Sequence, residues 1–366
     1  MVRLRSPQAA LRDHFYLVIM AGGTGTRLWP KSRTATPKQF QKILGSETLL
    51  KTTFKRVSKL VADPDHIFVS TNRACAAMVR KELPELPRKN LIIEPEPRNT
   101  APAMAVAAWV ISKRDPQAIV ATAPSDHVVL NKKKYYQAIE QGIRVLTRDP
   151  NQLITVGIKP TYAETGYGYI KLGAPYRAKL KSQILNPKSQ IFQVAKFVEK
   201  PSEKTAKQYL ASGSYLWNAS YFMWTAEHFL ELVAQFLPEV SKRLPQYPEY
   251  FASFPNVAID TAIAEKTKKI LVISADLGWS DIGSWAAVFD IMKKGGVRNV
   301  ASGKFIGIDT ENCLIQGADR LIATVGLKNM VVVDTGDVIL IAEKGASQKV
   351  KQVIEQLREQ GETKYL

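Results

Sequence analysis

The chain has 366 residues, of which 45% are hydrophobic and 23% are charged, a composition that is typical of globular proteins and excludes a disordered or fibrous class. No apolar run approaches the ~18 residues of a membrane-spanning helix, and the two cysteines lack the spacing of a disulfide framework or a zinc site. Lys and Arg exceed Asp and Glu by 18, which favours anionic partners. The basic residues are spread along the chain without a nucleic-acid-binding motif, so we expect phosphorylated metabolites as partners, and neither nucleic acid nor membrane.

The first strongly apolar run, residues 15–21, predicts a buried strand. Arg12, Asp13 and His14 precede it directly, and no small-residue cleavage site follows, so it does not resemble a signal peptide. We therefore expect a cytoplasmic protein.

Apolar runs rich in β-branched residues alternate with helix-like stretches from residue 15 onward, a pattern that predicts βα units and a mainly parallel sheet. Thr100 is expected to cap one helix, with Pro102 in its first turn. Residues 174–190 are rich in lysine and polar side chains and predict an exposed hairpin or loop. The predicted helices span residues 48–61, 72–83, 101–114 and 135–146, each after a predicted strand.

After Gly295 the sequence changes to short β-branched runs separated by Gly, Asp or Asn, which predicts a small β-rich domain of stacked coils. Val350, Val353, Ile354 and Leu357 then form one apolar stripe at helical spacing. We therefore divide the chain into a catalytic domain, residues 1–295, and a β-helix-like domain with a terminal helix, residues 296–366. These apolar faces need a covering surface, on the first domain or on a second subunit, so a homodimer is one expectation.

A glycine-rich segment, "AGGTGTRLWPKSRTATPKQF", follows the first strand and places main-chain N–H groups where a phosphate can approach them. Arg27 and Lys38 in this segment can neutralise a triphosphate. The spacing fits neither the Walker loop nor the G-x-G-x-x-G dinucleotide motif, so both of those nucleotide-binding classes are disfavoured. A tight structural turn is the alternative interpretation of the glycines alone.

This segment closely resembles the signature of the sugar nucleotidyltransferases, G-G-x-G-T-R-L-x-P followed by Pro-Lys, and "PKQF" is similar to the mannose-1-phosphate guanylyltransferase branch. The resemblance implies a Rossmann-like α/β nucleotidyltransferase domain that binds GTP, a sugar 1-phosphate and Mg²⁺. It implies four residues of the catalytic machinery: Arg27, Lys38, Asp126 and Asp281. Of these, Asp126 in "PSDH" and Asp281 in "DLGWSDIGSW" match the two metal-binding aspartates of the family.

The same resemblance implies the substrate-binding residues. "EPEPRNTAPA" is similar to the family segment that binds guanosine and lies at a helix start, where free N–H groups and a positive dipole end are expected. "ETGYGYI", "FVEKP" and "WNASYFMW" are similar to segments around the sugar phosphate. The nucleotide-binding set is Gly22, Gly23, Gly25, Thr26, Arg98, Asn99 and Thr100. The sugar-phosphate-binding set is Gly166, Tyr167, Gly168, Glu199, Lys200 and Asn218.

The sequence departs from the family at two places near the sugar. Ala219 and Ser220 replace Ser-Gly or Gly-Gly after Asn218, and Thr261 replaces Tyr after Asp260. These changes leave open a different sugar 1-phosphate, such as a heptose or glucose. A regulatory homologue that binds nucleotide sugars without making them is a further alternative, which the joint presence of the four catalytic candidates disfavours. The residues after Gly295 are too few for the additional isomerase domain of some relatives, so isomerase activity is not expected.

Overall fold

The computed structural model describes residues 13–23, 25–61, 63–176, 190–293, 295 and 297–366, and the chain divides into two compact units. The first comprises Met1–Gly22, Thr53–Ser125 and Val129–Trp279, and the second comprises Gly23–Thr52, Asp126–Val128 and Ser280–Leu366. A domain boundary near residue 295 stays a prediction. Among the described residues, no helix has the length and apolar character needed to cross a membrane.

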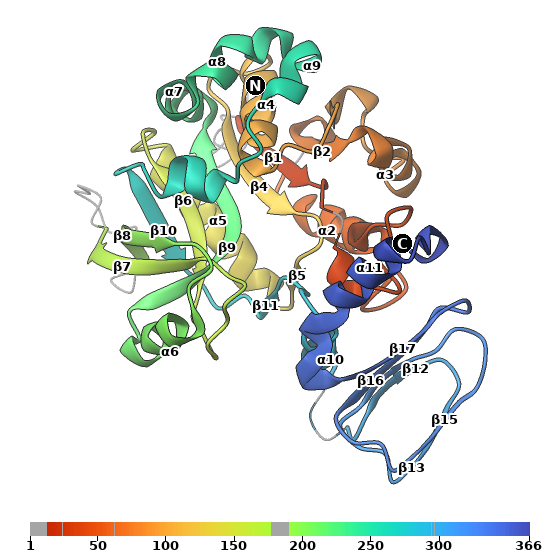
Figure 1. The fold of residues 1–366 in the computed structure, drawn as a ribbon. Helices are drawn as coiled ribbons and strands as arrows, with labels where there is room; N and C mark the ends of the chain where they lie inside the picture. The colour runs from red at the N-terminus through yellow and green to blue at the C-terminus, as the bar shows by residue number, and fades with distance from the viewer. Residues whose placement is uncertain (1–12, 24, 62, 177–189, 294, 296) are drawn as a thin grey trace, which may run out of the picture. The chain divides into compact units, whose positions relative to one another are not determined.

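The first unit contains a nine-stranded sheet in the order β3-β2-β1-β4-β9-β6-β10-β8-β7 (Figure 1). Its strands are β1 (Phe15–Met20), β2 (Ile67–Asn72), β3 (Leu91–Glu94), β4 (Ile119–Pro124), β6 (Leu153–Ile158), β7 (Tyr169–Pro175), β8 (Ile191–Val198), β9 (Tyr215–Thr225) and β10 (Ile270–Ser274). The short strands β5 (Val128–Val129) and β11 (Trp279–Ser280) lie where the chain passes between units.

The predicted parallel βα units make up one half of this sheet, in which β3, β2, β1 and β4 are parallel neighbours. Met20 pairs with Pro124, so the carboxyl ends of β1 and β4 meet at the same edge. This edge of an open α/β sheet is where ligands generally bind.

The other half of the sheet contains mostly antiparallel pairs, with β6 and β10 parallel, so the sheet as a whole is mixed. Strand β9 runs antiparallel to β4, β6 and β7, and β8 runs antiparallel to β10 and β7. Alternating apolar residues do not distinguish parallel from antiparallel pairing, so the sequence pattern did not reveal the antiparallel pairs. Most of the predicted exposed loop at residues 174–190 lies outside the described residues.

Four helices, α2 to α5, begin within about four residues of their predicted starts, and four more, α6 to α9, follow in the second half of the first unit. They are α2 (Leu49–Val57), α3 (Ala76–Glu82), α4 (Thr100–Ser112), α5 (Lys132–Leu146), α6 (Glu203–Ser212), α7 (Ala226–Phe236), α8 (Pro238–Arg243) and α9 (Tyr247–Tyr250). Helix α4 is apolar on nearly all sides and lies within the main hydrophobic core. A helix of this kind is stable only when it is buried on all sides.

The second unit carries the C-terminal strands and helices. These are β12 (Val300–Ser302), β13 (Phe305–Ile308), β14 (Leu314–Gln316), β15 (Ile322–Val325), β16 (Met330–Asp334), β17 (Ile339–Glu343), α10 (Trp285–Met292) and α11 (Val350–Glu359). β12, β14 and β16 are parallel neighbours, as are β13 and β15, whereas β17 is antiparallel to β16. The parallel register of successive short strands confirms the predicted β-helix-like coils.

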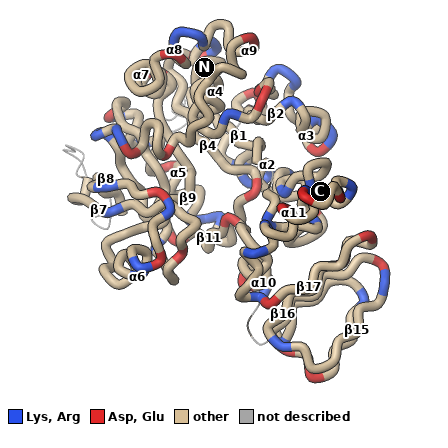
Figure 2. Tube along the Cα trace, viewed as in Figure 1, with Lys and Arg blue, Asp and Glu red and all other residues tan. Residues whose placement is uncertain are grey.

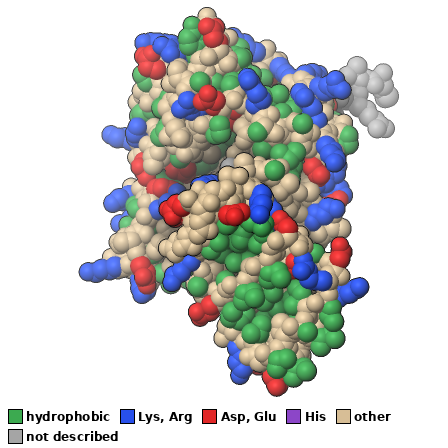
Figure 3. Space-filling model, turned by 45° about the vertical axis from the view of Figure 1, so that its right-hand side comes forward, with side chains coloured by type: hydrophobic (Ala, Val, Ile, Leu, Met, Phe, Trp, Pro, Cys, Tyr) green, Lys and Arg blue, Asp and Glu red, His purple; other side chains and the backbone are tan. Residues whose placement is uncertain are grey.

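Basic and hydrophobic side chains are distributed differently over the surface. Lys and Arg occur along elements of both units (Figure 2). Hydrophobic side chains gather on the C-terminal strands (Figure 3), where Ile308, Val325 and Ile341 are more than half exposed. A contiguous exposed apolar patch is typical of an interaction surface.

Candidate active site

The glycine-rich loop leaves β1 at the carboxyl edge of the sheet and runs into a short 3-10 helix, Thr26–Leu28. The Ala21 amide donates to the Ser70 carbonyl at 2.8 Å, which fixes the start of the loop. Gly25 has φ 59°, and a Cβ there would lie 2.2 Å from Cβ of Lys38, so only glycine fits. Arg27 is exposed on the 3-10 helix, available to a triphosphate.

Lys38 connects the two aspartates that the sequence singles out. Its side chain is almost fully buried, and Nζ donates to Oδ2 of Asp126 at 2.7 Å and to the main-chain carbonyl of Asp281. The second unit therefore brings three of the four catalytic candidates together from segments far apart in the chain.

The two carboxylates fit the ligand chemistry of a divalent cation. Burial alone would raise the pKa of the Asp126 carboxyl, but the charges of Lys38 and His127 lower it below its usual value, so the group is ionised at neutral pH. Oδ1 of Asp281 accepts from the Gly283 amide at 3.0 Å, which orients that side chain. No group of three or more potential metal-ligating side chains occurs among the described residues. A site with two carboxylates suits an ion that retains water and substrate phosphates as its other ligands.

The C-terminal part of the chain packs directly on this loop. Trp29 and Leu28 share one hydrophobic core with Trp285, Val300 and Ile354. Nε1 of Trp285 donates to the Trp29 carbonyl at 2.9 Å, which satisfies a buried acceptor. Within the second unit, residues after Gly295 therefore pack on Leu28 and Trp29 of the glycine-rich segment.

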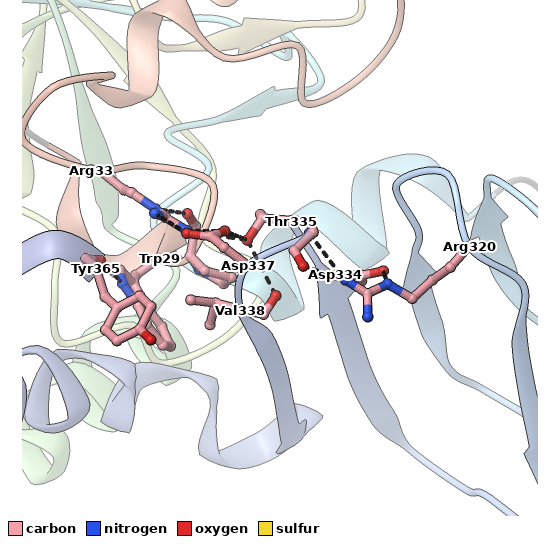
Figure 4. A network of polar contacts seen from close by, with 10 residues as sticks. Trp29, Arg33, Arg320, Asp334, Thr335, Asp337, Val338 and Tyr365 are labelled. Atoms are coloured by element: carbon pink, nitrogen blue, oxygen red, sulfur yellow. Dashed lines mark hydrogen bonds and ion pairs between the residues drawn. The ribbon is translucent and has the colours of Figure 1, made fainter.

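A polar network also joins the glycine-rich segment to residues near the C-terminus (Figure 4). Arg33 forms two parallel hydrogen bonds with Asp337, at 2.7 and 2.8 Å, and Nε1 of Trp29 donates to the Tyr365 carbonyl at 2.7 Å. The Arg33 guanidinium is the main cause that lowers the pKa of Asp337 to about 2. Paired bonds of this kind fix orientation as well as distance. The loop that carries Arg27 and Lys38 is therefore fixed by residues near the end of the sequence.

The segment that resembles the guanosine-binding motif differs in detail from the prediction. Helix α4 begins at Thr100, and Asn99 rather than Thr100 caps it, because its Oδ1 accepts from the Thr100 amide at 2.9 Å. The Ala101 amide donates to Val257, so two of the N–H groups expected to be free are already bonded. The Thr100 hydroxyl instead accepts from the Ile259 amide at 2.9 Å. Arg98 forms an ion pair with Glu96 at 2.9 Å.

Glu94, at the end of β3 in the same motif, is a buried acid that sequence reasoning did not single out. It is 5% exposed, and the Ser70 hydroxyl donates to its Oε1 at 2.8 Å. Burial raises the pKa of the Glu94 carboxyl to about 7, against a smaller opposing effect of Ser70. The sequence pattern that could have drawn attention to Glu94 is an acidic residue at the end of an apolar strand.

The predicted sugar-side residues converge within the first unit. The Lys200 amide donates to the Tyr167 carbonyl at 3.2 Å, and the Asn218 amide donates to the Gly168 carbonyl at 2.8 Å. A Cβ at Gly168 would lie 2.7 Å from Oε2 of Glu199, so a side chain there would displace this carboxylate. Glu199 and Lys200 form an ion pair at 2.8 Å. Gly166 lies in the same loop, where its amide donates to a neighbouring glutamate.

Asn218 is held in one orientation by three partners. Its Oδ1 accepts from the Thr155 hydroxyl at 2.9 Å and from the Ser220 amide at 3.2 Å, and its Nδ2 donates to Oδ1 of Asp260 at 2.7 Å. Burial, with the nearby charge of Glu199, raises the pKa of the Asp260 carboxyl to about 7. The sequence marked Asp260 only as part of a departure from the family pattern, and its contact with Asn218 gives it a place at the site.

Comparisons with known proteins find relatives of both parts of the chain. A family model described as nucleotidyl transferase matches residues 16–296, and one described as the MannoseP isomerase/GMP-like beta-helix domain matches residues 303–357. Mannose-1-phosphate guanylyltransferase 2 of Escherichia coli O157:H7 is 37% identical over 95% of this chain and 74% of its own length. Mannose-1-phosphate guanylyltransferase of Escherichia coli is 36% identical over 95% of this chain and 75% of its own length.

A solved structure from Thermus thermophilus, described as a mannose-1-phosphate geranyltransferase, has a TM-score of 0.84 to this chain at 28% identity. The similarity covers 94% of this chain and 99% of that one, so it extends over both the sheet and the β-helix. The chain therefore belongs to the nucleotidyl transferase family, within the group of mannose-1-phosphate guanylyltransferases that carry the β-helix domain.

Proposed function

We propose that this chain transfers the GMP group of GTP to α-D-mannose 1-phosphate, with GDP-mannose and pyrophosphate as products. The observation that supports this most directly is the cluster of Lys38, Asp126 and Asp281 beside the glycine loop. Such a transfer needs cations and N–H donors around the phosphates rather than a protein nucleophile, and the cluster supplies them.

In the proposed reaction, a phosphate oxygen of the sugar 1-phosphate attacks the α-phosphorus of GTP in line, and pyrophosphate leaves. Gly22, Gly23, Gly25, Thr26 and Arg27 bind the triphosphate. Within the described part of the chain, the Lys38 ammonium uses two of its three N–H donors on Asp126 and Asp281, so the third can meet an oxygen of the α-phosphate.

Asp126 and Asp281 are the residues that would hold Mg²⁺, an ion that prefers carboxylate and phosphate oxygens. When bound, Mg²⁺ supplies positive charge that stabilises the charge developing on the reacting phosphates. The pKa of Asp126, lowered by Lys38 and His127, keeps this carboxylate ready to bind a cation at neutral pH.

We assign the guanosine moiety to Arg98, Asn99 and Thr100, and the sugar phosphate to Gly166, Tyr167, Gly168, Glu199, Lys200 and Asn218. The Glu199 carboxylate and the Asn218 amide suit the hydroxyl groups of a sugar, and Lys200 suits its phosphate. Asp260 positions Asn218 in this assignment.

The decisive assay measures pyrophosphate release from each nucleoside triphosphate with each of several sugar 1-phosphates, with and without Mg²⁺. We expect kcat/KM for GTP to exceed that for ATP or UTP at least about tenfold, a difference of about 1.4 kcal/mol in transition-state binding. Equal values for GTP and ATP would remove the guanylyl assignment and leave nucleotidyl transfer standing. No release with any pair would favour a regulatory homologue, and a preference for heptose or glucose 1-phosphate would correct the sugar.

We also propose that the enzyme works in the cytoplasm as a homodimer. The exposed Ile308, Val325 and Ile341 on the C-terminal strands are suited to a subunit interface. Light scattering on the purified protein, compared with a variant in which Val325 and Ile341 are changed to Lys, tests this. A wild-type protein that stays monomeric at micromolar concentration contradicts it.

A further inference from the structure

A cavity in the first unit is lined by none of the residues assigned to catalysis or substrate binding. It has a volume of about 500 Å³ and lies between α2, the residues after α3, and the first turn of α5. This volume is within the range of small-molecule sites. Its charged lining residues are Lys55, Arg56, Lys59, Lys132 and Glu85, which give four positive charges against one negative charge.

Arg56 gives the cavity a fixed cationic wall. The residue is 2% exposed, its Nη2 donates to the Thr53 hydroxyl at 3.1 Å, and its guanidinium lies 5.3 Å from the ring centroid of Tyr135. A guanidinium that is already oriented loses little conformational entropy when an anion binds. Lys59 and Lys132, in contrast, are exposed and can turn toward a ligand.

Tyr136 contributes a hydrogen-bond donor. Within the described residues, its buried hydroxyl has no hydrogen-bond partner. Burial raises the pKa of this hydroxyl, while the charge of Arg56 acts in the opposite direction, so the group remains protonated at neutral pH. Buried hydroxyls nearly always have a partner, and a ligand oxygen in this cavity would supply one.

Of the two helices that border the cavity, α5 presents its N-terminus, which favours an anion, whereas α2 presents its C-terminal end, which opposes one. Lys132 is the first residue of α5, a helix of 15 residues, and Asn131 caps this N-terminus by accepting from the Lys134 amide at 3.1 Å. The positive end of the α5 dipole is therefore at the cavity. Near the end of α2, the Phe54 carbonyl accepts from the Ser58 hydroxyl at 2.7 Å, which reduces the negative potential there.

We propose that this cavity binds a small phosphorylated metabolite at a site separate from the active site. Its phosphate group contacts Lys59, Lys132 and Arg56 and accepts from the Tyr136 hydroxyl. Its carbon skeleton lies against the rings of Phe54 and Tyr136. The proposal does not depend on the nucleotidyl transfer reaction.

The test is calorimetric titration of the full chain with inorganic phosphate and with phenyl phosphate, at constant ionic strength. We expect a saturable site with a Kd below about 1 mM for phenyl phosphate, and weaker binding of inorganic phosphate. Lys132→Glu should weaken this binding at least about tenfold, because it replaces an attractive charge with a repulsive one. Tyr136→Phe should weaken it about fivefold, the effect of one hydrogen bond.

Lys133→Glu is the matched control, since Lys133 is exposed on the same turn of α5, is not part of the cavity lining, and undergoes the same charge change. The Kd of the Lys133→Glu variant for phenyl phosphate should stay within about twofold of the wild-type value. If Lys132→Glu unfolds, Lys132→Met tests the same contact without charge reversal. Equal weakening in Lys132→Glu and Lys133→Glu, or no saturable binding of either probe by the wild type, would overturn the proposal.

Discussion

Replacing Lys38 with Met tests whether the Lys38 ammonium holds the carboxylate of Asp126, which we propose to be catalytic. Nζ of Lys38 is 2.7 Å from Oδ2 of Asp126, with the Lys38 side chain 6% exposed and the Asp126 side chain 30% exposed. Removing one partner of a fully buried ion pair costs about 3–5 kcal/mol, and removing one partner of a surface pair costs about 0–1 kcal/mol. Because Asp126 retains some contact with water, we expect Lys38→Met to lower the free energy of unfolding by about 2–3 kcal/mol.

The double variant Lys38→Met/Asp126→Asn separates this effect from a general loss of packing. Asn has nearly the shape of Asp but no charge, so the second change removes the carboxylate that the first leaves unpaired. We therefore expect the double variant to be about 1–2 kcal/mol more stable than Lys38→Met. Turnover should stay about a hundredfold or more below wild type in both variants, because each lacks charges proposed to act on the phosphates.

The assay is urea unfolding of the wild type and each variant, together with pyrophosphate release from GTP and mannose 1-phosphate. Lys42→Met, at an exposed lysine of the same segment, is the control and should change stability by less than about 0.5 kcal/mol. If Lys38→Met were as stable as wild type, or if adding Asp126→Asn gave no recovery, Lys38 would not be the group that holds Asp126.

Three further predictions concern the site and its support. Asp281→Asn should lower turnover by orders of magnitude without unfolding the protein, and near-normal pyrophosphate release would remove Asp281 from the site. Burial raises the pKa of Glu94 to about 7 from its ordinary value of 4.5, so the free energy of unfolding of the wild type falls as the pH rises through this interval. The Glu94→Gln variant cannot titrate, so between pH 5 and pH 8 its stability in urea unfolding should rise by about 2 kcal/mol relative to that of the wild type. A stability difference between the two proteins that does not change with pH would contradict a buried acid at this position. Trp285→Phe leaves the buried Trp29 carbonyl without its donor and should cost about 1–3 kcal/mol, with a parallel loss of activity; unchanged stability and turnover would show that this bond does not support the loop.

Local sequence patterns predicted the structural elements that depend only on residues close together in the chain. The β1 strand, the glycine turn and the capped α4 helix follow from residues that are close together in the chain, and the predicted positions are close to the observed ones. The identity of the helix cap was less certain, because Asn99 and Thr100 are both good capping residues and differ by one position.

Long-range partners could not be predicted in the same way. The contacts of Asn218 with Thr155 and Asp260 depend on how antiparallel strands pair, which alternation of apolar residues does not specify. The raised pKa of Asp260 likewise comes from burial and from Glu199, an effect that appears only once the chain has folded. The family resemblance named Lys38, Asp126 and Asp281 in advance. Only the structure shows that the Lys38 ammonium bonds to both Asp126 and Asp281.

The bond from Trp29 to the Tyr365 carbonyl joins residues 336 positions apart. During synthesis, the first strands and the glycine turn leave the ribosome long before the residues that fix Trp29 and Arg33 have been translated. Closing so large a loop is slow and entropically costly, so we expect the glycine-rich segment to become ordered only after α11 has formed. A ribosome stalled near codon 340 should therefore carry a nascent chain whose sheet has begun to fold and whose glycine segment is still cleaved readily by protease.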